Sequence, residues 1–169
     1  MEKWDILDQN GEKTGKTMER GECGDGVYHR VVHVCLFSTK GGLLIQKRTS
    51  TKEVWPGFWD VSAGGSVLAG EDSRTAAMRE MKEELGLDIA LSHPALTMYS
   101  AHAIDDYYIV VQDLHRDALI LQESEVEEVR GANERDIREM IKDGTFIPYH
   151  VNLIKLLFDL RYGSGAHRS

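Results

Sequence analysis

The chain has 169 residues, of which 41% are hydrophobic and 28% are charged, and its formal net charge is −8. This length and hydrophobic content suit one folded domain and differ from those of a wholly disordered chain. The acid excess argues against a general nucleic-acid binder, because such proteins need a positive field to attract phosphates.

The first twenty residues predict an N-terminal β-hairpin, because strand-like runs at 4–7 and 13–18 flank the turn-forming pair Asn10-Gly11. After a glycine-rich loop, runs rich in β-branched and aromatic residues predict further strands. These strands are expected at residues 30–38, 43–47, 59–62, 107–111 and 126–129.

Three segments are typical of helices, at residues 73–85, 134–142 and 152–162. The first follows an N-cap candidate, Asp72, and precedes Gly86, a residue that favours the left-handed position after a helix. Because the strands outnumber the helices and alternate with them, we expect an α+β fold with a mixed β-sheet covered by helices.

The ends and the cysteines of the chain exclude several protein classes. Two cysteines, Cys23 and Cys35, are too few for a disulfide scaffold or a four-thiolate zinc site. No signal peptide is visible, and no apolar run reaches the ~18–20 residues that cross a bilayer. We therefore expect a cytoplasmic protein with no membrane partner, either monomer or homodimer, with one domain at 1–162 and a flexible tail at 163–169.

The helix predicted at 73–85 carries three carboxylates on one side. At about 100° per residue, Glu80, Glu83 and Glu84 lie within roughly a 100° arc, next to an apolar side that contains Met81. Like charges at these spacings repel each other, and the helix dipole disfavours anions in the last turn. A solvated acidic face would account for three glutamates by themselves, whereas a bound divalent cation would remove the repulsion.

The sequence around these glutamates favours the cation. It resembles the Nudix box, the signature of the Nudix hydrolase superfamily: Gly, five residues, Glu, seven residues, Arg-Glu-apolar-any-Glu-Glu-any-Gly-apolar. The seven fixed positions are filled by Gly65, Glu71, Arg79, Glu80, Glu83, Glu84 and Gly86. At ordinary residue frequencies, chance would produce such a match in about one chain in a million.

The resemblance implies a Nudix fold, an α/β/α sandwich that binds Mg²⁺ or Mn²⁺ over a small-molecule diphosphate. The metal ligands that it implies are Glu80, Glu83, Glu84, the carbonyl of Gly64, and Glu71. Arg79 would orient the neighbouring carboxylates through charge-assisted hydrogen bonds. The implied reaction is attack of a metal-activated water on phosphorus, with a carboxylate that accepts the proton of the water.

The general base is left open by the sequence. Some Nudix enzymes use a glutamate of the box and others use a later one. Glu80 and Glu84 are our first candidates. Glu125 resembles the first residue of a downstream glutamate-valine pair and is the alternative base, and Asp105 and Asp106 are further candidates.

Roughly the first ninety residues resemble isopentenyl diphosphate isomerase and its hydrolase relatives. The resemblance lies in residues 5–8, 10–11, 28–30, 46–48, 52 and 55–57. The isomerase uses a cysteine just before the box glycine as its acid and a histidine just after it as a metal ligand. Gly64 and Ser66 stand at those positions here, and Glu22 stands at that of another metal histidine, so hydrolysis is favoured over isomerisation.

Basic residues near the loop at 49–58 are candidates for substrate binding. Arg48 and Lys52 match the phosphate-binding pair of the isomerase, and an arginine can bind phosphate oxygens with its forked guanidinium. Lys47 adjoins them. His29 matches a metal histidine of the isomerase but lacks its histidine partners, so we expect it to bind substrate or to make a structural hydrogen bond.

These residues lead to three hypotheses. The first is a hydrolase that cleaves the phosphoanhydride of a nucleoside diphosphate linked to another moiety, or of a similar organic pyrophosphate. The second, disfavoured by Gly64 and Ser66, is an isomerase of isoprenoid diphosphates. The third is a non-catalytic nucleotide sensor. A nucleic-acid partner is not expected, because no extended basic run is present.

Overall fold

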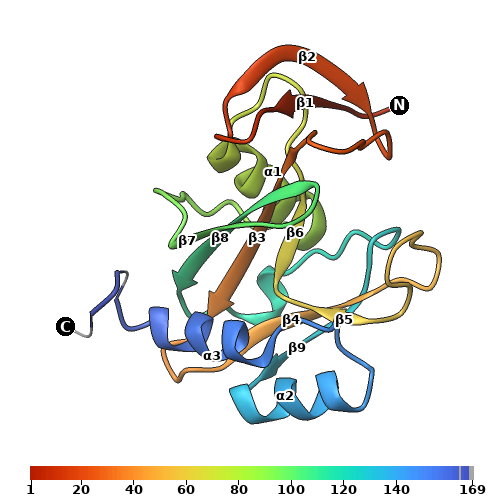
Figure 1. Ribbon diagram of the computed structural model, residues 1–169. Coiled ribbons are helices and arrows are strands. Elements are labelled where there is room, and N and C mark those ends of the chain that lie inside the picture. Colours follow the sequence, from red (N-terminus) through yellow and green to blue (C-terminus); the bar gives the residue numbers. More distant parts are fainter. Residues whose placement is uncertain (164, 168–169) are drawn as a thin grey trace.

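The N-terminal hairpin forms a small sheet of its own. β1 (Lys3–Leu7) pairs antiparallel with β2 (Lys13–Glu19), and the turn between them contains Gly11 at a φ of 80°, which glycine adopts without strain. The computed structural model describes residues 1–163 and 165–167. Figure 1 shows the hairpin at the top of the view, beyond the main sheet and near one end of α1 (Ser73–Leu85).

The main sheet is mixed and has seven strands. They are β3 (His29–Phe37), β4 (Leu43–Arg48), β5 (Trp59–Asp60), β6 (Ala63–Ser66), β7 (Leu96–Tyr99), β8 (Ala103–Val111) and β9 (Val126–Ala132). β3 pairs in parallel with β8 along its whole length. On its other edge it pairs with β6 and meets β4 at one residue pair, Phe37 and Leu43. β4 in turn pairs with β5 and β9. On this side of β3 the sheet therefore has two branches, one formed by β6 and the other by β4 with β5 and β9.

Helices cover both faces of this sheet, as expected for an α/β/α sandwich. Alternate side chains of β3 point to opposite faces. Val32, Val34 and Leu36 pack in a core with Met81 and Leu85 of α1. On the opposite face a second core contains residues of α2 (Glu134–Lys142) and α3 (Val151–Leu160).

The termini of α1 follow the local rules that predicted them. The side chain of Asp72 accepts a hydrogen bond from the amide of Thr75 at 2.7 Å. Gly86 has a φ of 71°, and its amide donates to the carbonyl of Lys82. A side chain at Gly86 would also meet Ile120, because a Cβ there would lie 2.8 Å from Ile120 Cβ. Both termini of this helix were predicted correctly.

Several boundaries differ from the prediction. β7 was not predicted, and three of its four residues are exposed, so no alternation marks it as a strand. β8 begins four residues before the predicted start at 107. The prediction missed these residues because Asp105 and Asp106 are polar and interrupt the hydrophobic pattern of a strand. A short 3-10 helix, η1 (Arg116–Ala118), was also not predicted. α3 is shifted by one or two residues at its ends relative to the prediction.

The remaining expectations concern membrane spans, the C-terminal tail and the number of domains. In the part of the chain that the structure describes, no helix is both long and apolar enough to span a bilayer. Residues 164, 168 and 169 of the expected flexible tail lie outside the described residues, so its flexibility stays a prediction, as does the single domain at 1–162.

Candidate active site

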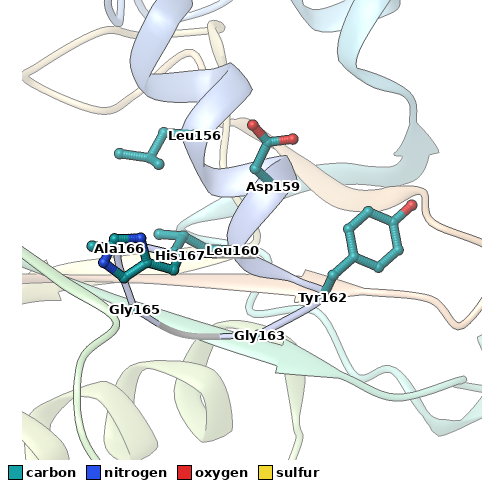
Figure 2. A pocket seen from close by; sticks show the side chains of 8 residues that line it. All are labelled: Leu156, Asp159, Leu160, Tyr162, Gly163, Gly165, Ala166 and His167. Atoms are coloured by element: carbon teal, nitrogen blue, oxygen red, sulfur yellow. The ribbon is translucent and has the colours of Figure 1, made fainter. Parts of the chain in front are cut away.

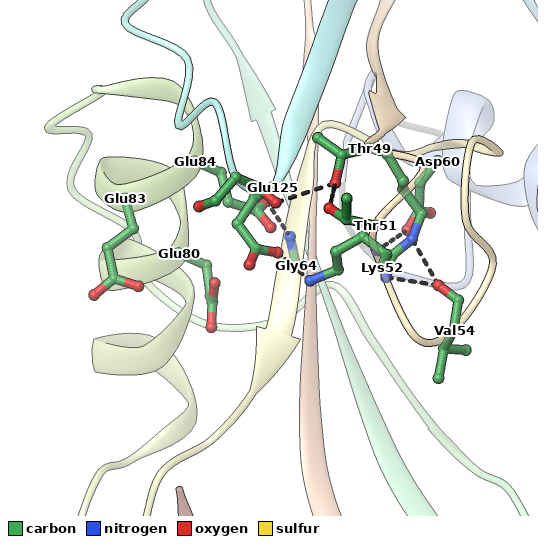
Figure 3. Close-up of polar contacts among 12 residues, drawn as sticks. Thr49, Thr51, Lys52, Val54, Asp60, Gly64, Glu80, Glu83, Glu84 and Glu125 are labelled. Carbon is green, nitrogen blue, oxygen red and sulfur yellow. Dashed lines mark hydrogen bonds and ion pairs between the residues drawn. The ribbon is translucent and has the colours of Figure 1, made fainter. Parts of the chain in front are cut away.

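Two carboxylates of the predicted box, Glu80 and Glu84, lie between α1 and β6, in contact with Gly65 and Gly64. Met81 and Leu85 bury one side of the helix in the core. Glu80 and Glu84 follow beside that apolar side, so Glu84 is also buried, whereas Glu83 is exposed. Figure 3 shows these three glutamates on one side of Gly64, with Lys52 and Glu125 close to it.

A polar pocket of about 210 Å³ collects most of the predicted site residues. The predicted residues that line it are Arg48, Lys52, Gly64, Gly65, Arg79, Glu80, Glu83, Glu84 and Glu125. The pocket also contains Glu2, Arg20 and Gln122, which the sequence did not indicate. Glu71, Lys47 and His29 lie outside this lining.

Glu84 is a buried carboxylate held by neutral donors. Gln46 Nε2 donates to its Oε2 at 2.8 Å, and the amide of Gly64 donates to the same oxygen at 3.2 Å. Burial, together with the negative charge of Glu80, raises the pKa of Glu84 to about 8. Burial likewise raises the pKa of Glu80 to about 7, although Arg79 opposes this shift. Glu84, which is buried, and its neighbour Glu80, which is partly buried, therefore have too little positive charge around them to stay fully ionised at neutral pH.

Gln46 was missed in the sequence because nothing local marks it. It lies on β4 two residues before Arg48, and side chains two apart in a strand share a face. The same alternation points Lys47 away from the pocket, where its Nζ forms an ion pair with Glu127 at 2.9 Å. Lys47 therefore does not line the pocket, and the substrate contact expected of it stays a prediction.

Arg79 connects the helix to the preceding loop. Its Nε and Nη2 donate to the two carboxylate oxygens of Glu71 at 2.8 and 3.0 Å. Its Nη1 donates to Glu80 at 2.8 Å and to Glu83 at 3.2 Å, and its Nη2 also donates to the carbonyl of Ser66. Glu71 thus lies behind the guanidinium, and Arg79 sets the positions of two carboxylates in the pocket.

Arg48 and Lys52 form the opposite wall of the pocket. Lys52 Nζ is ion-paired with Glu125, and Arg48 donates from Nε and Nη2 to the carbonyl of Val54 at 3.1 and 2.9 Å. Both cations are therefore held in place by the loop at 49–58 and by Glu125 (Figure 3). These contacts already restrict the two side chains. A phosphate that bound to them would therefore cost less side-chain conformational entropy.

His29 has the surroundings of a structural histidine. Its ring stacks on Trp4 with centroids 4.2 Å apart, and its Nδ1 lies 3.0 Å from the carbonyl oxygen of His102. Burial lowers the pKa of His29, which favours the neutral ring. Of its two predicted roles, the contacts favour the structural hydrogen bond.

The downstream carboxylates separate into two groups. Glu125 lines the pocket. Asp105 Oδ1 lies 2.8 Å from Nε2 of His33, and the buried Asp106 accepts hydrogen bonds from Arg30 and from two hydroxyl groups. Asp105 and Asp106 thus belong to other networks, and neither lines the pocket.

The donor set of the pocket fits a hard divalent cation. Within the described ranges, no three carboxylate, histidine or cysteine side chains are gathered closely enough to hold a metal as they stand, and Arg79 pairs with Glu80 and Glu83. Glu84 forms no ion pair with any described residue. Carboxylate and carbonyl oxygens are the ligands that Mg²⁺ and Mn²⁺ prefer, and a cation would supply the positive charge that Glu80 and Glu84 lack.

A larger hollow, of about 460 Å³, lies where the end of α3 meets the residues after it (Figure 2). Its lining is mostly apolar or glycine, with Asp159, Tyr162 and His167 as its polar side chains. It contains none of the predicted site residues. The chemistry therefore points to the smaller carboxylate pocket.

Comparison with known proteins shows the family of this chain. Residues 27–154 match the NUDIX domain family. The chain belongs to the Nudix family of hydrolases. The box that predicted this family membership and the enzyme class is therefore confirmed as a family signature.

Individual Nudix relatives support both resemblances. An uncharacterized Nudix hydrolase of Listeria innocua is 46% identical over 171 residues, which cover 99% of each chain. An isopentenyl-diphosphate Delta-isomerase of Escherichia coli is 32% identical over 111 residues, which cover 64% of this chain and 60% of the isomerase. The crystal structure of DR0079 from Deinococcus radiodurans superposes with a TM-score of 0.76 at 24% identity, over 92% of this chain and 97% of that one. The Nudix fold is thereby confirmed.

Gly65 of the Nudix box offers a test of how closely loop and helix pack. A Cβ added at Gly65 would clash with Oε1 of Glu80, so the flexible carboxylate would have to move. For Gly65→Ala we expect hydrolysis to fall roughly tenfold or more, with little change in thermal stability. Gly131→Ala is the matched control, because no atom of the described residues lies within 4 Å of a Cβ built there, apart from its chain neighbours. Equal activity of both variants would contradict the expectation.

Proposed function

We propose that this Nudix hydrolase cleaves the phosphoanhydride bond of a small organic diphosphate, such as a nucleoside diphosphate linked to another group. The observation that carries the proposal is the pair of the partly buried Glu80 and the buried Glu84, which shares one polar pocket with the cations Arg48 and Lys52. An acidic half suits a divalent cation, and a basic half suits phosphate oxygens.

In this proposal Glu80, Glu83, Glu84 and the carbonyl of Gly64 hold Mg²⁺ or Mn²⁺, with Glu71 as a further candidate. When bound, such a cation neutralises phosphate charge and makes a water more acidic. Arg48 and Lys52 bind the phosphate oxygens from the opposite wall. Arg79 orients Glu80 and Glu83 by charge-assisted hydrogen bonds.

The proton of the attacking water goes to a carboxylate of the pocket. Glu84 and Glu80 are the favoured bases, because both line the pocket where the attacking water would lie. Their raised pKa values belong to the metal-free protein, and a bound cation would lower them. Glu125 is the alternative base. Its ion pair with Lys52 favours a role in holding that cation.

A screen for cleavage products tests the proposed activity. The purified protein would be incubated with Mg²⁺ or Mn²⁺ and with nucleoside di- and triphosphates, dinucleotides, nucleotide sugars, coenzyme A and isoprenoid diphosphates. The products would be separated by chromatography, because cleavage between the two phosphates of a nucleotide sugar or dinucleotide leaves one phosphate on each fragment and releases no inorganic phosphate. We expect cleavage of at least one diphosphate, dependent on the metal. No cleavage of any of them at high protein concentration would refute the proposed function.

Lys52 provides a separate test of phosphate binding. In Lys52→Met the substrate loses a cationic contact and meets the unpaired charge of Glu125, so we expect KM to rise roughly tenfold or more. We expect kcat to change less. Steady-state kinetics with the best substrate of the screen measures both, and Lys155→Met, at an exposed position of α3, controls for the loss of charge. A fall confined to kcat would contradict the binding role.

A further inference from the structure

The N-terminal hairpin holds the loop between β6 and α1 at several points. Asp5 Oδ2 accepts a hydrogen bond from the amide of Gly70 at 2.9 Å. Lys13 Nζ donates to the carbonyl of Glu71 at 2.9 Å and is ion-paired with Asp5 at 2.8 Å. A main-chain bond adds to these contacts, because the amide of Ala69 donates to a carbonyl of β1. Three consecutive residues of the loop are therefore bound to the hairpin.

Glu71, the last of these three loop residues, contacts the arginine that orients the carboxylates of the pocket. Glu71 binds the guanidinium of Arg79 through both carboxylate oxygens. Arg79 binds Glu80 in turn. A continuous chain of charged and hydrogen-bonded groups thus runs from the hairpin, through the loop, to the carboxylates of the pocket.

The loop has few bonds of its own that would fix it. Glu71 donates from its amide to the carbonyl of Leu68, and its carboxylate accepts from the amide of Leu68. Gly70 lies between them with a φ of 88°, and glycine is free to adopt many other conformations. A movement at Gly70 would displace Glu71 and so alter the partner of Arg79. The contacts from Asp5 and Lys13 restrain the loop at Gly70 and Glu71, where it has few other bonds.

We infer that Asp5 and Lys13 are positioning residues, and that the hairpin sets the geometry of the metal-binding carboxylates by holding residues 69–71. The hairpin precedes the Nudix domain match at 27–154, so this chain supports its site with a segment outside that domain. The consequence for metal binding and turnover rests on the proposed function. The consequence for the loop follows from the contacts themselves.

Two substitutions on the hairpin, made in the full chain, test this inference. Lys13→Met removes the contact with Glu71 at a position whose side chain is 50% exposed, so the variant is expected to fold. Asp5→Ala removes the acceptor of Gly70. Lys13→Arg keeps a cationic donor and should restore part of the wild-type behaviour. Lys16→Met, on an exposed position of the same strand, is the matched control.

Two measurements on these variants separate positioning from simple stabilisation. Hydrogen exchange of the amides at 69–71, measured without metal, should be faster in Lys13→Met and Asp5→Ala than in the wild type and in Lys16→Met. Calorimetric titration with Mn²⁺ should show a dissociation constant raised roughly tenfold, with kcat lowered and KM for the diphosphate nearly unchanged.

The outcomes are distinct from those of the substrate screen. Unchanged amide exchange together with unchanged Mn²⁺ affinity in both variants would overturn the inference, even if their melting temperatures fell. If the wild type cleaved no diphosphate, the proposed function would fail. The exchange and Mn²⁺ measurements would still support or overturn the positioning role.

Discussion

Glu84→Gln is expected to lower turnover by about three orders of magnitude while the protein stays folded. The substitution keeps the shape of a side chain that is 4% exposed and removes the negative charge. The charge is what the proposed cation and the proposed proton transfer both require, and loss of a general base alone costs about 10²–10⁴ in rate. Initial rates with Mg²⁺ on the best substrate of the screen would measure the loss.

The same substitution should change how stability depends on pH. The pKa of Glu84 is raised from an ordinary 4.5 to about 8 in the folded state. Over that interval the folded protein keeps a proton that the unfolded chain has lost, so the free energy of unfolding falls as pH rises. We expect metal-free wild type to lose stability between about pH 5 and pH 8, with the greater part of this loss absent from Glu84→Gln. Added Mg²⁺ should stabilise the wild type more than the variant.

Glu128→Gln is the control for this experiment, because Glu128 is exposed and outside the pocket. It should match the wild type in turnover and in the pH dependence of unfolding, measured by urea titration at several pH values. Glu84→Gln with near-normal turnover would exclude Glu84 as base and as essential ligand. Glu80→Gln and Glu125→Gln, assayed in the same way, would then identify the residue that takes the proton.

Arg79→Met should have the second largest effect, and it should act on stability as well as on catalysis. The side chain of Arg79 is 21% exposed and pairs with Glu71 and Glu80, which are 19% and 13% exposed. Removal of the guanidinium leaves these carboxylates without a counter-charge and with little access to water. We expect a loss of about 3 kcal/mol in the free energy of unfolding and at least a hundredfold fall in turnover.

Arg79→Lys distinguishes charge from geometry at this position. A lysine keeps the positive charge but cannot bind both oxygens of Glu71 and Glu80 at once, because its ammonium lacks the planar fork of arginine. It should recover part of the stability and little of the turnover. Arg74→Met, an exposed arginine on the same helix, should leave both unchanged. Normal turnover in Arg79→Met would mean that the carboxylates reach their positions without it.

The sequence by itself determined the parts of this protein that depend on near neighbours in the chain. Asp72 caps α1 through the amide of Thr75, and Gly86 ends it, because both effects act within a few residues. The hairpin turn at Asn10-Gly11 was equally local. The spacing of Glu80, Glu83 and Glu84 placed them on one side of a helix, and the resemblance of the box supplied the family.

The tertiary structure alone decided which distant residues meet these carboxylates. Gln46 reaches Glu84 because β4 leaves β3 after one residue pair and brings Gln46 to Ser62, the residue before β6. Lys47 turns outward because neighbouring side chains of a strand face opposite ways. Asp5 and Lys13 reach the loop because the hairpin folds back over it, across 65 and 58 residues of sequence. Such contacts depend on strand pairing and packing between segments far apart in the chain, for which no local pattern exists.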